Sequence, residues 1–253
     1  MRIWYDHEPT QIGKHIFGRC QEPDWTTDAQ ISCGAPNLLL LEPEIVDHKS
    51  KHLADDFKIV ASIYPIHHPN NIQYTYRTPP LWPELTRLNT NCVKRNQNAI
   101  IAVMGNKYRH RRNILNSRIQ EAIDNQLQLD LFGTPSWSIT QYQGAIPPNQ
   151  KRKYLQQYKY CYCPENSFYP NYITEKLPEA ILAGCIPIVD HIQDTTRYPY
   201  FPWKFICTSI EQTKQINYDD YIQTVIECQD EIIEKHSASY MLDEIEQAAA
   251  VYT

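Results

Sequence analysis

The segment from Cys163 to Asp190 constrains the fold of this chain more than any other part of it. An aromatic run, Tyr158 to Tyr162, precedes the segment and has the short, apolar character of a buried strand. Pro164 then ends the strand, and the Asn, Ser and Pro residues that follow are typical of an ordered loop. After the loop come a helical pattern that stops at Gly184 and a second apolar strand. The segment therefore predicts a strand, a loop, a helix and a strand in that order.

The predicted helix begins at or just before Glu175 and Lys176, with Thr174 as a candidate N-cap. Free backbone N–H groups and the positive end of the helix dipole would face the loop there, an arrangement that suits a phosphate group. Lys176 adds a full positive charge, and Glu175 and Tyr172 can exchange hydrogen bonds with sugar hydroxyls. From the spacing alone, an ordinary capped helix with a solvated Lys176 is the simpler interpretation.

Composition excludes several classes of protein. The chain has 253 residues, 42% of them hydrophobic, which is enough for one large domain or two small ones. Its net charge of −5 argues against a protein that binds nucleic acid over its whole surface. Its eight cysteines form no CxxC pair, so we expect reduced thiols and no metal site. No apolar run is long enough to span a membrane, and the N-terminus lacks the core of a secretion signal. We expect a soluble, cytoplasmic protein, with the loss of a membrane anchor as the alternative.

The first part of the chain is irregular, and the second part alternates regularly. Proline residues interrupt the first part, and the polar run Asn89–Asn98 is typical of a crossover between halves. The strands expected in the first part are 1–5, 37–41 and 57–63. The later pattern predicts strands at 99–104, 127–132 and 204–207, a helix at 112–123 with Ile114, Leu115, Ile119 and Ile123 on one side, and a helical stretch at 218–250. Such alternation favours an α/β fold with a parallel sheet covered by helices.

Three short motifs inside the central segment resemble the signature of the family 10 glycosyltransferases, the α-1,3/4-fucosyltransferases. They are Glu165-Asn166-Ser167, Tyr172-Ile173-Thr174-Glu175-Lys176 and Gly184-Cys185-Ile186-Pro187-Ile188-Val189. One departure is that Asp190-His191 follows, where the family usually has a glycine. The resemblance implies a GT-B-like fold, with two Rossmann-like lobes facing a cleft and a small first lobe. We expect an acceptor-side lobe at 1–95 and a nucleotide-sugar-binding lobe at 96–253.

A basic turn, Gly105 to Arg112, follows a predicted strand and leads into a helix, where open α/β sheets bind ligands. From the residues alone it could equally be a solvated basic turn or a nucleic-acid contact. The resemblance favours the donor's diphosphate, with Arg112 as the best match and Arg109 and Arg111 as near-register rivals. It also implies that Lys176 binds the diphosphate. The remaining residues that it assigns to the donor are Asn166, Ser167, Tyr172 and Glu175.

Motifs of several other enzyme classes are absent from the sequence. There is no GxGxxG and no Walker A loop, which argues against a dinucleotide oxidoreductase and an NTPase. No Asp-x-Asp occurs either, so we expect no obligatory metal, and cations would have to stabilise the leaving diphosphate. For the base, Glu42 follows an apolar strand and resembles the family's glutamate, but Pro43-Glu44 replaces Ser-Pro. The choice between Glu42 and Glu44 stays open, and a solvated strand terminus is the alternative.

The resemblance thus implies an inverting glycosyltransferase, similar to the α-1,3-fucosyltransferases, that moves fucose from GDP-fucose to a hydroxyl of a glycan acceptor. A related nucleotide sugar is the alternative donor, because Asp190-His191 departs from the family in the expected donor pocket. The alternative function is a non-catalytic nucleotide-sugar- or glycan-binding protein derived from such a transferase. We expect no nucleic-acid partner; nucleic-acid binding is the third interpretation.

Overall fold

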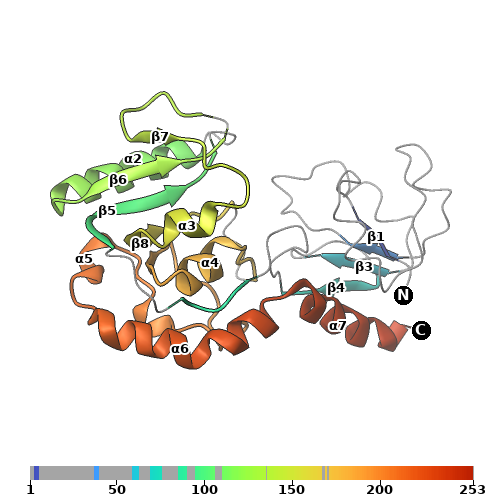
Figure 1. The fold of residues 1–253 in the computed structure, drawn as a ribbon. Coiled ribbons are helices and arrows are strands. Elements are labelled where there is room, and N and C mark those ends of the chain that lie inside the picture. Colours follow the sequence, from blue (N-terminus) through green and yellow to red (C-terminus); the bar gives the residue numbers. More distant parts are fainter. Residues whose placement is uncertain are drawn as a thin grey trace. The chain divides into compact units, whose positions relative to one another are not determined.

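The computed structural model describes residues 3–5, 37–39, 59–62, 69–75, 85–89, 95–105, 110–134, 136–166, 169 and 171–252 (Figure 1). The chain divides into two compact units. The first unit comprises Met1–Glu84, Asn166–Glu175 and Glu234–Thr253, and the second comprises Leu85–Glu165 and Lys176–Ile233. The lobe boundary between residues 95 and 96 stays a prediction.

The second unit contains a five-stranded sheet in the order β7-β6-β5-β8-β9, and each neighbouring pair is parallel. In its central strand, residues 99–102 are almost completely buried. Helices cover both faces of such a sheet, which is why this strand is a continuous apolar run. The strands are β5 (Asn96–Val103), β6 (Gln128–Phe132), β7 (Tyr142–Gly144), β8 (Tyr158–Tyr162) and β9 (Ile186–Ile188).

Helices connect these parallel strands. Helix α2 contacts β6, α3 contacts β8 and α4 contacts β9 (Figure 1). The predicted strand at Lys204–Cys207 is wrong. Hydrogen bonds from Phe205 N to Pro202 O and from Ile206 N to Trp203 O form a 3₁₀ turn there, η2 (Trp203–Phe205). Within this segment only Cys207 pairs with a strand, through a bridge to Ile188 of β9. The other helices are α2 (His110–Asp124), α3 (Lys151–Leu155), α4 (Lys176–Leu182), α5 (Ile210–Thr213) and α6 (Tyr218–Lys235).

Helix α2 confirms the predicted helix but corrects its buried face. Leu115 and Ala122 are each 1% exposed, whereas Ile123 is 58% exposed. An α-helix turns by about 100° per residue, so Ile123 lies about 180° from Ile114 around the axis. The prediction of a single apolar side was therefore wrong for Ile123.

Gly184 ends α4, as its position in the sequence predicted. Its φ of 80° lies in the left-handed region that favours glycine, and its N–H bonds to Ile181 O. Two arginines bind the last carbonyls of the helix: Arg152 Nη2 donates to Leu182 O at 3.1 Å, and Arg95 Nη2 donates to Ala183 O at 2.7 Å. Cations at this end complement the helix dipole.

The first unit contains a four-stranded parallel sheet in the order β1-β2-β3-β4. Helix α7 (Ala238–Ala249) contacts β4 and continues into η3 (Ala250–Tyr252). Asn171 Nδ2 donates to Tyr74 O at 2.7 Å and so ties the 166–175 segment to the chain just after β4. The strands are β1 (Ile3–Tyr5), β2 (Asn37–Leu39), β3 (Ile59–Ser62) and β4 (Asn71–Gln73).

The helical stretch predicted at 218–250 consists of two helices, α6 and α7. Between them, the Ser237 hydroxyl donates to Glu234 O at 2.7 Å and accepts from Tyr240 N at 3.2 Å. A serine in this role is a typical N-cap, so Ser237 starts a new helix where the amphipathic pattern alone continues. In the ranges that the structure covers, no helix has the length and apolar character needed to cross a membrane.

Candidate functional site

The carboxyl ends of β5, β8 and β9 meet at one edge of the parallel sheet in the second unit. Such an edge is where open α/β sheets bind ligands. Strand β5 leads into the basic turn before α2, and β8 leads into the motif-bearing segment before α4. The topology therefore places the two candidate phosphate-binding segments after neighbouring strands.

Arg112 lies in the first turn of α2, and its side chain is exposed. This position agrees with a cation that meets a ligand at the sheet edge. Lys107 and Arg109 lie outside the described residues. The assignment of Arg112 to the diphosphate stays a prediction.

Lys176 is the first residue of α4 and pairs with Glu165, the last residue before the 166–175 segment. Lys176 Nζ lies 3.4 Å from Glu165 Oε2, and the two side chains are 13% and 8% exposed. The attraction between the carboxylate and the ammonium offsets part of the desolvation free energy of holding Lys176 in a largely buried position. The sequence contained Glu165 within its motif, but nothing in the spacing indicated this pairing.

Cys163 joins the end of β8 to its surroundings. Its backbone N–H donates to Ile188 O at 2.8 Å, and its Sγ lies 3.6 Å from Lys176 O. Because the first contact extends the pairing of β8 with β9 and the second reaches the first residue of α4, Cys163 fixes where the helix begins relative to the sheet. The thiol of Cys163 thus contacts the backbone of Lys176 at the start of α4.

The other motif residues belong to the first unit. Tyr172 is 1% exposed and Glu175 is 6% exposed. Asn166 is half-buried, and among the described residues its Oδ1 has no hydrogen-bond partner. Ser167 lies outside the described residues. The structure therefore places Glu165 and Lys176 in one unit and the residues between them in the other.

Glu42 and Glu44, the candidate bases, also lie outside the described residues. The structure confirms a strand just before them, β2, which pairs in parallel with β1 and β3. Glu42 and Glu44 thus follow the carboxyl end of a central strand, and their role stays a prediction.

A partly buried cluster of charged and polar side chains lies where α2 meets the ends of β8 and β9. Its members are Arg118, Glu121, Tyr162 and Asp190. Burial lowers the pKa of Arg118, but its hydrogen bond to Glu121 and the charges of Glu121 and Asp190 more than offset this, so the pKa is raised overall. Burial and the Asp190 carboxylate raise the pKa of Tyr162 well above its usual value, which keeps the hydroxyl protonated as a donor. Sequence reasoning singled out Asp190 as a departure but missed its partners.

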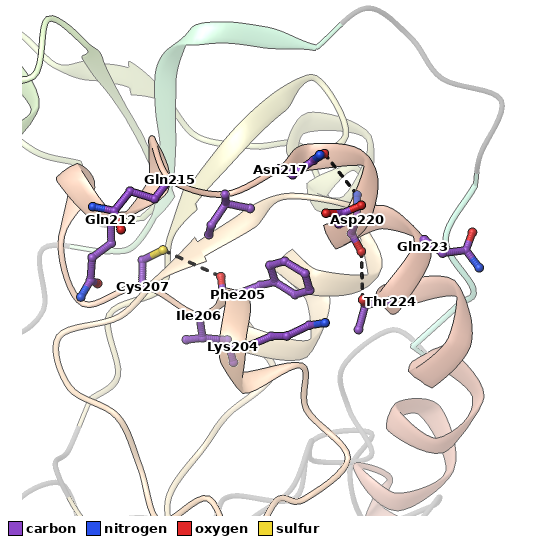
Figure 2. A pocket seen from close by; sticks show the side chains of 11 residues that line it. Lys204, Phe205, Ile206, Cys207, Gln212, Gln215, Asn217, Asp220, Gln223 and Thr224 are labelled. Atoms are coloured by element: carbon purple, nitrogen blue, oxygen red, sulfur yellow. Dashed lines mark hydrogen bonds between the residues drawn. The ribbon is translucent and has the colours of Figure 1, made fainter.

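A hollow of about 740 Å³ lies elsewhere on the second unit, between the 204–207 segment, the end of α5 and the first turns of α6. Figure 2 shows the ring of Phe205 with Asn217 and Asp220 above it and Lys204 below it. No predicted site residue within the described part of the chain lines it. In the same described ranges, no cluster of three or more His, Cys, Asp and Glu side chains is arranged to hold a metal ion. That the reaction needs no metal stays a prediction.

Comparison with solved structures shows a likeness of fold. The chain matches TarM at 10% identity with a TM-score of 0.53, covering 85% of this chain and 51% of that one. A TarM mutant from S. aureus in complex with Fondaparinux, α-GlcNAc-glycerol and UDP gives 11% identity and a TM-score of 0.51, with 85% and 51% coverage. An α1,3-fucosyltransferase gives 15% identity and a TM-score of 0.45, with 87% and 66% coverage. The chain spans about half the length of the TarM structures.

The likeness to the two TarM structures, together with the two parallel sheets, confirms the predicted α/β fold of the GT-B type. No curated protein sequence matches the chain. The model of the glycosyltransferase family 10 (fucosyltransferase) C-terminal domain matches residues 93–206, a range that includes the first turn of α2, strand β8 and helix α4. The match to this family thus covers residues 93–206, the range that also contains the motifs around Lys176.

Proposed function

We propose that this chain is an inverting glycosyltransferase that transfers fucose from GDP-fucose to a hydroxyl group of a glycan acceptor. The observation that supports the proposal most is the family match over residues 93–206, which contains both cation-bearing segments at the carboxyl edge of the sheet. Arg112 follows β5 and Lys176 follows β8, and these two strands are neighbours.

In this reaction the two cations stabilise the charge of the departing nucleoside diphosphate. Arg112, exposed in the first turn of α2, is suited to bind phosphate oxygens in a bidentate manner. Lys176 acts as a point charge whose position is set by Glu165. Preorganised donors of this kind stabilise the transition state because they need no reorganisation as the charge develops.

The acceptor hydroxyl attacks the anomeric carbon on the face opposite the diphosphate, so configuration at that carbon inverts. Either Glu42 or Glu44 takes the proton from the attacking oxygen. A positioned base of this kind contributes ~10²–10⁴ in rate. Asn166, Ser167, Tyr172 and Glu175 are assigned to the donor's ribose and fucose by their match to the family motif.

The first experiment is a thermal-shift comparison of GDP-fucose, GDP-mannose and a UDP sugar with the full chain. A ligand at a hundred times its Kd stabilises the folded protein by about 2.7 kcal/mol, so the true donor stands out from the others. GDP-fucose should give the largest shift. An equal or larger shift with a UDP sugar would contradict the guanosine assignment.

A turnover measurement separates the enzyme from a non-catalytic binding protein. Incubation with GDP-fucose should release GDP slowly through transfer to water, and faster when an acceptor glycan is present. Replacement of Glu42 or Glu44 by Gln identifies the base, because the correct variant keeps nucleotide binding and loses turnover. Binding of GDP-fucose with no release of GDP across a library of acceptors would favour the non-catalytic alternative.

A further inference from the structure

We propose that Arg118 and Asp190 are positioning residues for the donor diphosphate: their buried ion pair fixes helix α2 against the sheet and thereby fixes Arg112 in the first turn of that helix. The proposal rests on the function proposed above, because Arg118 and Asp190 act through Arg112 and do not contact the donor themselves.

Arg118 reaches from α2 to the end of strand β9. Its Nη2 donates to the backbone carbonyl of Val189 at 2.9 Å and lies 3.5 Å from Asp190 Oδ1. The side chains of Arg118 and Asp190 are 12% and 11% exposed, so water screens the pair only weakly. Both contacts use the same nitrogen, Nη2, so a displacement of α2 along the sheet would lengthen both of them.

Strand β8 supplies a second partner to the Asp190 carboxylate. The Tyr162 hydroxyl donates to Asp190 Oδ1 at 2.8 Å, and the Arg118 guanidinium carbon lies 5.4 Å from the centre of the Tyr162 ring. Asp190 stands near the place where the family signature has a glycine. A buried carboxylate needs compensating partners, and here both come from elements that flank the predicted donor edge. The cluster therefore depends on a residue that departs from the signature.

Glu121 gives α2 a second anchor close to the first. Its Oε2 accepts from Arg118 Nη1 at 2.6 Å, and its Oε1 accepts from the backbone N–H of Ile210, the first residue of α5, at 2.6 Å. The bond from Arg118 to Val189 O thus holds α2 to the end of β9, and the bond from Ile210 N to Glu121 holds α2 to α5. Two anchors on different elements fix both the position and the rotation of the helix.

The position of Arg112 follows from these anchors. Arg112 and Arg118 lie on one continuous helix, separated by about 9 Å of axial rise. A shift at Arg118 is therefore transmitted to the first turn. A misplacement of about 1 Å can cost ~10² in rate at a reacting centre, so a change at Asp190 should reach the diphosphate through Arg112.

The test is a double-mutant cycle between Asp190→Asn and Arg112→Ala, with the affinity for GDP measured by calorimetry on the full chain. Asp190→Asn alone should weaken GDP binding by about ten-fold, and it should have almost no further effect when Arg112 is already alanine. Tyr162→Phe keeps the ring and removes one hydroxyl, so it should weaken GDP binding by about three-fold through the same route. This milder variant decides the matter if Asp190→Asn fails to fold.

The matched control is Asp194→Asn, which removes a nearby exposed carboxylate paired with Arg197 at 3.4 Å. GDP affinity should be unchanged in this variant. The positioning role is overturned if the effects of Asp190→Asn and Arg112→Ala simply add, or if Asp190→Asn and Tyr162→Phe lower the melting temperature and leave GDP affinity unchanged. Either result requires that the unsubstituted protein binds GDP and so leaves the proposed function standing. An unsubstituted protein that binds no guanine nucleotide overturns the proposed function and this role together.

Discussion

Lys176 Nζ lies 3.4 Å from Glu165 Oε2, and these two residues flank the segment 166–175 that leaves the second unit and returns to it. The ion pair joins the two ends of that excursion where the chain re-enters at α4. It also holds the ammonium of Lys176 at the carboxyl edge of the sheet before any ligand is bound. The same pair therefore serves the fold and prepares the proposed phosphate site.

The pair predicts opposite effects for its two members on nucleotide binding. Lys176→Ala should weaken GDP binding by about ten- to hundred-fold, because a charge-assisted hydrogen bond contributes about 1.5–3 kcal/mol. Glu165→Gln keeps an amide oxygen that can position the ammonium but removes the carboxylate charge that competes with phosphate, so GDP binding should be equal or stronger. Calorimetric titration with GDP measures both.

Stability should respond differently from binding. Lys176→Ala leaves the 8%-exposed Glu165 carboxylate without this partner and should lower the free energy of unfolding, as the loss of one member of a buried pair does. The Lys176→Ala/Glu165→Gln double variant should recover part of that loss in urea unfolding. Equal GDP affinities in the two single variants would show that Lys176 does not bind the diphosphate.

Arg112→Ala should weaken GDP binding and leave stability almost unchanged. The side chain of Arg112 is exposed, and exposed surface substitutions usually change the free energy of unfolding by less than about 0.5 kcal/mol. Lys214→Ala is the matched control. Lys214 is also an exposed cation, its Nζ lies 3.1 Å from Glu211 Oε2, and it is not one of the predicted site residues. Arg109→Ala and Arg111→Ala complete the series; if either weakens GDP binding more than Arg112→Ala does, the register assigned to the basic turn is wrong.

Local features of the fold were predictable from the sequence because a few neighbouring residues determine them. Strand β8 spans Tyr158–Tyr162, as its aromatic run predicted, and Gly184 ends α4 because glycine readily adopts the required φ. The order of strand, loop, helix and strand around Lys176 followed from the same short-range signals. The same elements lie within residues 93–206, the range that the glycosyltransferase family 10 model matches.

Contacts between distant parts of the chain could not be predicted in the same way. Arg118 and Asp190 are 72 positions apart, and Glu121 and Ile210 are 89 positions apart. Nothing in the spacing of either pair indicates a contact, which depends on the order of strands in the sheet. Ile123 was misassigned for a related reason: an apolar residue type suggested burial, but its angle around α2 places it in solvent.

Gly184→Ala should destabilise the second unit by about 1–3 kcal/mol, because the backbone conformation disfavours alanine and the site is crowded. A Cβ atom at Gly184 would lie 2.6 Å from Arg95 Nη2 and 3.0 Å from Leu88 Cδ1. Displacing Arg95 would also weaken its hydrogen bonds to Ala183 O and Tyr158 O. Urea unfolding measures the loss.

Gly144→Ala separates backbone strain from crowding. Gly144 also has a positive φ, 111°, but a Cβ there would meet nothing within 4 Å. Both substitutions carry the backbone cost of alanine at a positive φ, and only Gly184→Ala adds the displacement of Arg95 and Leu88. A gain in stability when Arg95→Ala is added to Gly184→Ala would confirm the crowding, and a further loss would contradict it.

Two thiols, the buried Cys207 and the half-buried Cys228, should make the protein less stable in alkaline solution. Burial raises the pKa of Cys207 to about 11, and burial chiefly raises the pKa of Cys228 to about 11 as well. The ordinary value for each thiol is 9.0, so the folded state retains its thiol protons at a pH where the unfolded state releases them. This contribution to stability is fully present below the unfolded pKa and is lost as the pH rises through the folded pKa.

The free energy of unfolding should therefore fall as the pH rises from 9.0 to about 11. Cys207→Ala/Cys228→Ala should show a shallower fall over that window than the unsubstituted chain, because it lacks two groups that bind protons more tightly when folded. Urea unfolding at several pH values across the window measures the slope for both proteins. Parallel slopes would show that the two thiols titrate alike in the folded and unfolded states and that their burial does not resist ionisation.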